Sequence, residues 1–234
     1  MGRHFEVRAA AMAKSGARKS ALYARASREI YMAAKSGLPD PNSNLALRSA
    51  IDKFKGQSVP RDVIERAIKK AQGGDAETYS PGRYEAFGPG NSFLIIDSLT
   101  DNANRAFVEI RTAVTKKGGH MGTVNYNFAE TGILVFNFEN KDLVEETLIL
   151  GDVDVREISL EEGVMEVLVE PTSFGQAKDL LNSLGVEEFQ VAEIQMLANE
   201  TITLGEEDKT LFQELLDVLD ELQDVQNVFH NVNL

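Results

Sequence analysis

The charged side chains of the first 72 residues are the groups in this chain most able to do chemistry. Fifteen of the 24 lysines and arginines lie between Met1 and Gln72, together with only six of the 37 acids. This segment carries +9, whereas the rest of the chain, with nine bases and 31 acids, carries −22. Cationic side chains at this density neutralise phosphates and release their counterions. The asymmetry predicts a polyanion partner for one end of the chain.

The cations of this basic segment are predicted to contact the phosphates of a nucleic acid. Arg18, Arg25, Arg28 and Lys35 share one arc of a helix predicted over 19–35, beside its apolar face. A solvated helix surface without a ligand is the alternative that spacing alone leaves open. The predicted nucleic-acid-binding residues are Arg3, Arg8, Lys14, Arg18, Lys19, Arg25, Arg28, Lys35, Lys53, Lys55, Arg61, Arg66, Lys69 and Lys70.

Three helices with short connections are predicted to position these cations. The first ends before Pro39 and Pro41, which cannot continue a helix. The second, with Asn42 or Ser43 as its cap, runs to about residue 55. The third runs over about 58–71 and takes Ser58 as its cap. The second and third helices could imitate a helix-turn-helix that presents its basic side chains to a groove. Residues 1–16 form either a short helix or an arm that orders on binding.

The acidic remainder is predicted to be built from short strands and single helices. β-branched runs lie at 91–99, 123–128, 133–138, 155–160, 164–169, 191–197, 202–204 and 225–230, and helical patterns lie at 102–117, 141–150, 174–184 and 206–222. This alternation predicts antiparallel split β-α-β units, so the fold class is α+β.

Enzyme chemistry finds little support among the residues. His4, His120 and His230 are scattered singly, without the spacing of a metal site. Asn102 or Thr100 can cap the helix that Arg105 begins; such a helix start can hold an anion, but a cap needs no ligand. We therefore predict no catalytic residues, no metal and no cofactor.

Composition limits the compartment. There is no cysteine and no apolar run long enough for a membrane span. The charged N-terminus does not fit a signal peptide. These features predict a cytoplasmic protein without a membrane partner, and they leave its oligomeric state open.

Several motifs resemble the YebC/PmpR family from end to end. The segment 58–70, SVPRDVIERAIKK, is similar to the family's "MPKDNIERAIK" helix, and 84–90, YEAFGPG, to its "YEGYGPGG" turn. The remaining motifs are LTDNANR (99–105), KGGHMG (117–122) and DVQNVFHN (224–231), which resemble "LTDNRNR", "GGNLG" and "DVQxVYxN". Phe5 stands where the family usually has Trp, and the Met-Gly-Arg start resembles its second subgroup.

The resemblance implies three domains: a basic helical domain at 1–78, an α/β domain at 79–130 plus 200–234, and an inserted α/β domain at 131–199. It also implies a DNA-binding transcriptional regulator or, as in other members, a translation factor with the ribosome as partner.

The leading hypothesis is a non-enzymatic regulator that binds duplex DNA through the helical domain. The first alternative is a translational activator that binds ribosomal RNA through its N-terminal arm and ribosomal proteins through its acidic part. The second alternative is a protein-interaction adaptor.

Overall fold

The computed structural model describes residues 16–73 and 78–234, which divide into two compact units. Unit 1 contains Tyr126–Glu200, and unit 2 contains the described residues up to Asn125 together with Thr201–Leu234. The predicted division into three domains stays a prediction. In the described ranges, no helix is long and apolar enough to cross a membrane.

The described part of the basic segment, residues 16–72, contains three helices, which we call the head. Helix α2 (Gly16–Lys35) packs against both α3 (Leu45–Lys55) and α4 (Arg61–Gln72). Apolar residues at helical spacing on α2 face the other two helices, as the sequence predicts. The buried residues of this core are Leu22, Ala26, Ile30, Ala34, Leu47, Ala50, Phe54 and Ala67.

The caps of the head helices differ from the prediction. Asn44, rather than Asn42 or Ser43, caps α3, because its Oδ1 accepts a hydrogen bond from the Leu47 N–H at 3.0 Å. The Asn44 Nδ2 also donates to the Ala33 carbonyl of α2 and to the Leu38 carbonyl of the loop, each at 2.9 Å, and the residue is buried. Helix α4 starts after Pro60 without a side-chain cap, so the prediction of Ser58 as the cap is wrong.

Unit 2 contains an antiparallel sheet in the order β3-β1-β2-β8. A tight turn joins its first two strands, in which the Gly88 N–H donates to the Ser92 carbonyl at 2.7 Å. Gly90 has a φ of 63° in this turn, a conformation that favours glycine. The strands are β1 (Ser80–Phe87), β2 (Phe93–Thr100), β3 (His120–Met121) and β8 (Val225–His230), with the short helix η1 at Pro89–Asn91.

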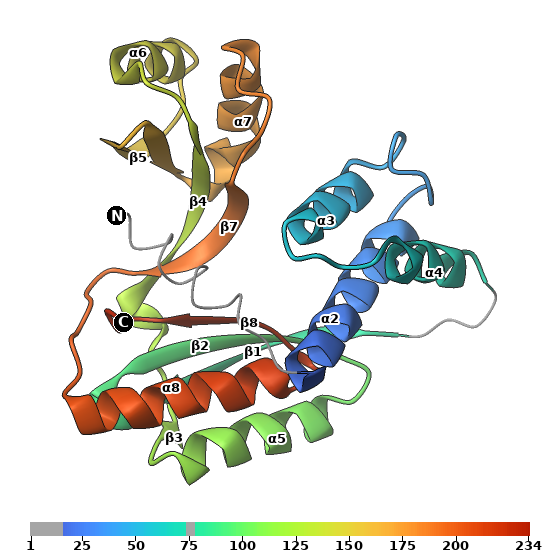
Figure 1. Cartoon of the computed structure of the whole chain (residues 1–234), viewed down its shortest axis with the longest axis vertical. Helices are drawn as coiled ribbons and strands as arrows, with labels where there is room; N and C mark the ends of the chain where they lie inside the picture. The colour runs from blue at the N-terminus through green and yellow to red at the C-terminus, as the bar shows by residue number, and fades with distance from the viewer. Residues whose placement is uncertain (1–15, 74–77) are drawn as a thin grey trace. The chain divides into compact units, whose positions relative to one another are not determined.

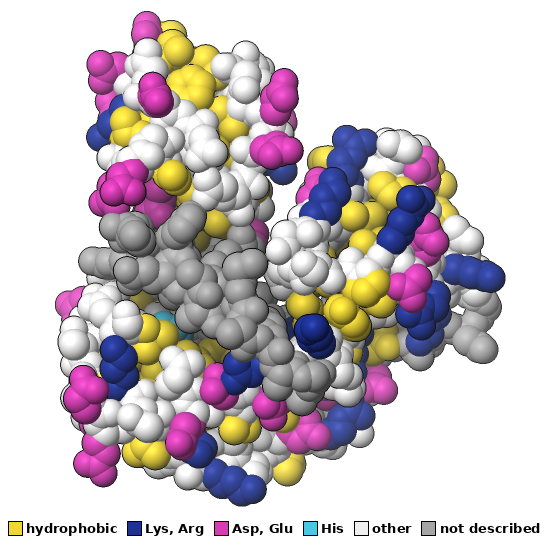
Figure 2. Space-filling model, in the orientation of Figure 1, with side chains coloured by type: hydrophobic (Ala, Val, Ile, Leu, Met, Phe, Trp, Pro, Cys, Tyr) yellow, Lys and Arg dark blue, Asp and Glu magenta, His cyan; other side chains and the backbone are white. Residues whose placement is uncertain are grey.

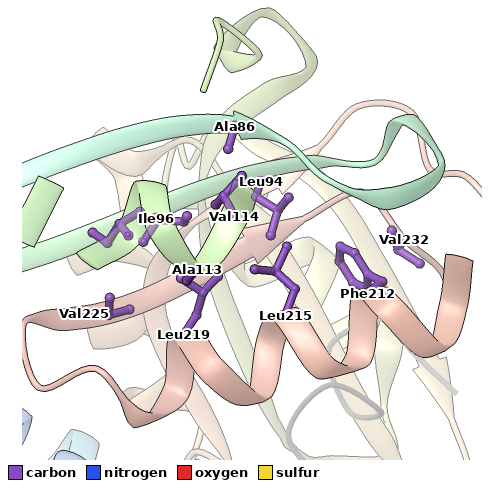
Figure 3. Packing of buried hydrophobic residues seen from close by; sticks show 11 residues of the cluster. Ala86, Leu94, Ile96, Ala113, Val114, Phe212, Leu215, Leu219, Val225 and Val232 are labelled. Carbon is purple, nitrogen blue, oxygen red and sulfur yellow. The ribbon is translucent and has the colours of Figure 1, made fainter. Parts of the chain in front are cut away.

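Two helices cover one face of this sheet, α5 (Ala103–Lys116) and α8 (Glu206–Glu221) (Figure 1). Figure 3 shows Phe212, Leu215 and Leu219 of α8 pointing toward Leu94 and Ile96 of the sheet, and all five are fully buried. Burying a large apolar side chain stabilises a fold by about 1.5–3 kcal/mol. This cluster therefore fixes α8 on the sheet.

Unit 1 repeats the arrangement with its own sheet and its own core. Its antiparallel strands follow the order β5-β6-β4-β7, and its two helices α6 and α7 pack on one face. The two ends of the unit are close, since Phe128 pairs with Ala198 and the Asn199 N–H donates to the Asn127 carbonyl at 2.7 Å. The elements are β4 (Phe128–Asn137), α6 (Lys141–Leu150), β5 (Val155–Glu161), β6 (Val164–Val169), α7 (Phe174–Ser183) and β7 (Val191–Ala198), with η2 at Asn125–Asn127 and η3 at Pro171–Ser173.

The predicted fold class is confirmed: in the described residues three helices precede two units that each carry helices on a four-stranded sheet, and unit 1 is inserted in the chain of unit 2. Two details differ. The predicted strand at 202–204 is a single bridge between Ile202 and Val232, and β1 begins in a segment, Ser80-Pro81-Gly82, that was not predicted to be a strand.

Candidate nucleic-acid interface

The cationic arc of α2 lies against acidic residues of the same unit. Arg18 pairs with Asp217, and its Nε lies 3.9 Å from Asp220 Oδ2. Arg25 Nη2 lies 2.6 Å from Asp220 Oδ1 and also donates to the Asp220 carbonyl at 2.9 Å. Both partners belong to the last turns of α8. The side chains of Arg18 and Arg25 are only 18% and 11% exposed, so this interface takes up most of their surface.

The third arginine of the arc joins a buried carboxylate. Arg28 Nη1 lies 2.7 Å from Asp224 Oδ1 and donates to the Leu99 carbonyl at 3.2 Å. The Asp224 side chain is 3% exposed, the lowest value among the acids in the ion pairs of the described chain. Because a buried charge is tolerated only when it is paired and hydrogen-bonded, the other partners of Asp224 decide whether this site is stable.

Those partners come from the end of β2 and the first turn of α5. Arg105 Nη2 donates to Asp224 Oδ2 at 2.8 Å, and the Thr100 hydroxyl donates to the same oxygen at 2.9 Å. Hydrogen bonds from Arg105 to Asp224 and to Asp101 raise the pKa of Arg105, and the same guanidinium holds the pKa of Asp101 below its usual range. Asn102 caps α5 by accepting from the Arg105 N–H at 3.0 Å. The prediction that Thr100 or Asn102 caps this helix is therefore confirmed for Asn102.

Other predicted contact residues of the head have acidic neighbours close in sequence or space. Lys53 Nζ lies 3.0 Å from Glu29, and Lys55 Nζ lies 2.5 Å from Asp52. On α4, Arg61 pairs with Glu65 and Arg66 with Asp62, each one helical turn apart. The side chains of Arg61 and Arg66 are 90% and 73% exposed. Exposed pairs of this kind contribute about 0–1 kcal/mol, so a phosphate can replace the carboxylate at small cost.

The remaining predicted cations are exposed or lie outside the described residues. Lys19 and Lys35 stand at opposite ends of α2, and Lys69 and Lys70 lie in the last turns of α4. Arg48, which the predicted set leaves out, is exposed on α3 and donates to the Pro41 carbonyl at 3.1 Å. In Figure 2 the head cations are spread among acidic and hydrophobic side chains. Arg3, Arg8 and Lys14 lie outside the described residues.

The arrangement of α3 and α4 gives little support to a helix-turn-helix. Each of these helices packs on α2 and makes few contacts with the other. In a helix-turn-helix, the first helix crosses the backbone while the second lies in the major groove. The exposed cations of α3 and α4 therefore fit contacts to phosphates better than readout of bases by one inserted helix.

A search for other chemistry finds no competing site in the described residues. They hold no group of three His, Asp or Glu side chains arranged to bind a metal. An open hollow of about 530 Å³ lies between the head and the end of the sheet in unit 2. Its lining includes the ion pairs Lys53–Glu29 and Arg83–Asp97, in which each charge already has a partner.

Comparison with known proteins covers the whole chain. Residues 3–74 match a family model described as the TACO1/YebC protein N-terminal domain, and residues 79–232 match one described as the TACO1/YebC second and third domain. A probable transcriptional regulatory protein from Mesoplasma florum is 47% identical over 237 residues. A protein of the same description from Alcanivorax borkumensis is 45% identical over 238 residues. Both comparisons cover 100% of each chain.

A solved structure shares the fold. The crystal structure of a conserved hypothetical protein from Aquifex aeolicus superposes with a TM-score of 0.75 at 31% identity, over 94% of this chain and 93% of the other. The two proteins therefore have a similar overall fold.

Proposed function

The chain belongs to the TACO1/YebC family, and from this premise we propose that it is a non-enzymatic regulator of gene expression that binds nucleic acid through its helical head. The observation that carries the proposal is the charge of the basic segment that contains the head, +9 over residues 1–72 against −22 for the rest of the chain. The relatives described as probable transcriptional regulatory proteins support duplex DNA as the ligand.

The contact surface we propose is the exposed set on α3 and α4, extended by both ends of α2. Its members are Lys19, Lys35, Arg48, Lys55, Arg61, Arg66, Lys69 and Lys70. These side chains reach solvent. The carboxylates that pair with Lys55, Arg61 and Arg66 are themselves exposed, so phosphate can compete with them. Unit 1 and the part of unit 2 outside the head are acidic, and a phosphate backbone would repel them. Binding is therefore confined to the head.

A charge reversal on α4 tests this proposal. We expect Lys69→Glu with Lys70→Glu to weaken binding of a labelled duplex in fluorescence anisotropy and to make its salt dependence shallower. Each lost phosphate contact lowers the slope of log K against log salt by about 0.9. The matched control, Lys116→Glu with Lys209→Glu, makes the same charge change at exposed positions on α5 and α8. Equal weakening in both variants would show that only net charge matters.

The translation alternative rests on the acidic part of the chain, which could meet basic ribosomal proteins while the head contacts ribosomal RNA. A DNA reader should prefer its own site over random duplex by about 4–10 kcal/mol. A ribosome factor should instead sediment with ribosomal particles and bind structured RNA better than any duplex. If the Lys69 and Lys70 reversal left every cellular association unchanged, the adaptor hypothesis would replace both.

A further inference from the structure

The interface between α2 and α8 uses cations that could otherwise face a nucleic acid. Arg18, Arg25 and Arg28 are nearly buried in these ion pairs, with side chains that are only 11–18% exposed. Their partners Asp217, Asp220 and Asp224 are spaced three and four residues apart, so the first two fall on one face of α8 and the third just beyond its end. A row of guanidinium groups thus meets a row of carboxylates.

The pairs Arg18–Asp217 and Arg25–Asp220 are more exposed to solvent than the pair Arg28–Asp224. Asp224 is buried and is shared with Arg105 and Thr100, so Arg28 belongs to a fixed site. Asp217 and Asp220 are 44% and 26% exposed, which leaves their carboxylates open to water and ions. We call the pairs Arg18–Asp217 and Arg25–Asp220 the outer lock.

The outer lock is also incompletely satisfied. The Arg18 Nε is buried and has no hydrogen-bond partner, and the nearest carboxylate oxygen, on Asp220, lies at 3.9 Å. A buried donor without a partner costs free energy. A ligand with more acceptor oxygens than two aspartates can supply would satisfy it better. Phosphates pair with the guanidinium fork through two parallel hydrogen bonds, as carboxylates do.

We propose that the outer lock is an autoinhibitory contact, in which Asp217 and Asp220 occupy Arg18 and Arg25 in place of nucleic-acid phosphates. This inference rests on the proposed function, since it assumes that the head binds nucleic acid. The free protein then binds through the exposed cations of the proposed contact surface, without Arg18 and Arg25. Full affinity requires the phosphate backbone to displace the carboxylates, so binding is weaker than the head's charge would give.

Removing the two carboxylates tests the lock directly. In Asp217→Asn with Asp220→Asn, we expect the Kd for a labelled duplex to fall about 3- to 10-fold, the range that two partly exposed ion pairs allow. The matched control is Glu206→Gln with Glu207→Gln, which removes the same charge at exposed positions in the first turn of the same helix, at the end away from Asp217 and Asp220. The control should change Kd less than 2-fold.

The outcomes separate the lock from the proposed function. An equal gain in both variants, or no gain in the Asp217/Asp220 variant, overturns the lock while the proposed function stands. If the wild type and both variants fail to bind duplex DNA and structured RNA, the proposed function fails and the inhibitory role fails with it. The single variant Asp217→Asn, at the more exposed position, guards against misfolding and should give a smaller gain in the same direction.

A second readout follows the head without nucleic acid. The chain has no cysteine, so Ser49→Cys on α3 with Lys209→Cys on α8 allows two dyes to be attached at exposed positions outside the proposed contact surface. We expect the Asp217/Asp220 variant to show lower energy transfer than the Glu206/Glu207 control, because the head is released more often. Added duplex should lower transfer in the wild type as well. Unchanged transfer in the variant and with duplex overturns the lock.

Discussion

Replacing Asp224 with asparagine gives the sharpest test of how the head is held in unit 2. The change keeps the shape of the side chain but removes the negative charge that faces Arg28 and Arg105. Removing one partner of a buried ion pair costs about 3–5 kcal/mol. Arg105 is 41% exposed and keeps Asp101, and Arg28 keeps the Leu99 carbonyl, so both cations remain partly solvated or bonded. We therefore expect a loss at or below the lower limit of this range, about 2–3 kcal/mol.

Thermal and urea unfolding followed by circular dichroism measure this loss. For a chain of this length, about 1 kcal/mol corresponds to about 2–4 °C, so Tm should fall by about 4–12 °C. Asp179→Asn, at an exposed position on α7, is the matched control and should stay within about 0.5 kcal/mol of the wild type.

A double-mutant cycle identifies the cause of the loss. In the wild type, Arg105→Gln should be clearly destabilising, whereas in the Asp224→Asn background the same change should cost much less, because the pair is already broken. A loss below about 0.5 kcal/mol for Asp224→Asn, or additive losses in the cycle, would refute the view that this carboxylate joins α2 to α5.

Three further changes probe the same unit. Hydrogen bonding from Arg105 lowers the pKa of Asp101 in the folded state. The stability that this pair gives the fold is therefore present above about pH 4 and is lost as the pH falls through the folded pKa. Asp101→Asn should remove that part of the acid dependence in urea titrations, and an unchanged profile would contradict it. Leu215→Ala should cost about 2–5 kcal/mol in urea unfolding, since the side chain is fully buried between α8 and the sheet, and a loss below 1 kcal/mol would mean that the core is loose there. Asn102→Ala removes the cap of α5 and should lower stability by about 1 kcal/mol, measured by the same unfolding, whereas Asn102→Ser should restore most of it.

Local patterns in the sequence predicted most elements because each depends on neighbouring residues. The helix at 103–116 follows from apolar residues at helical spacing and from a capping asparagine, both readable within one short window. Strand β1 could not be found in this way. It starts with Ser80-Pro81-Gly82, a poor strand sequence, and exists because β2 pairs with it along its whole length. Long-range pairing overrides local preference at this point.

The fate of the cationic arc on α2 was equally hidden. Helical spacing places Arg18, Arg25 and Arg28 on one face, but it does not say what that face meets. A signal did exist, since Asp217, Asp220 and Asp224 form a stripe of the opposite sign at complementary spacing near the other end of the chain. Two such stripes predict a contact only if the fold brings them together, and the sheet order β1-β2-β8 is what does so.

The closeness of the two ends of unit 1 bears on the order of folding. Unit 2 is assembled from two separate stretches of chain, and β8 must find β2 across the whole of the inserted segment. The entropy cost of closing a loop rises with the number of flexible residues that it contains. Once β4 has paired with β7, Phe128 stands opposite Ala198, and the insertion spans no more than the gap between two neighbouring strands. If unit 1 folds first, it shortens the effective loop between β2 and β8. The entropy cost of pairing β8 with β2 and of packing α8 on the sheet is then lower.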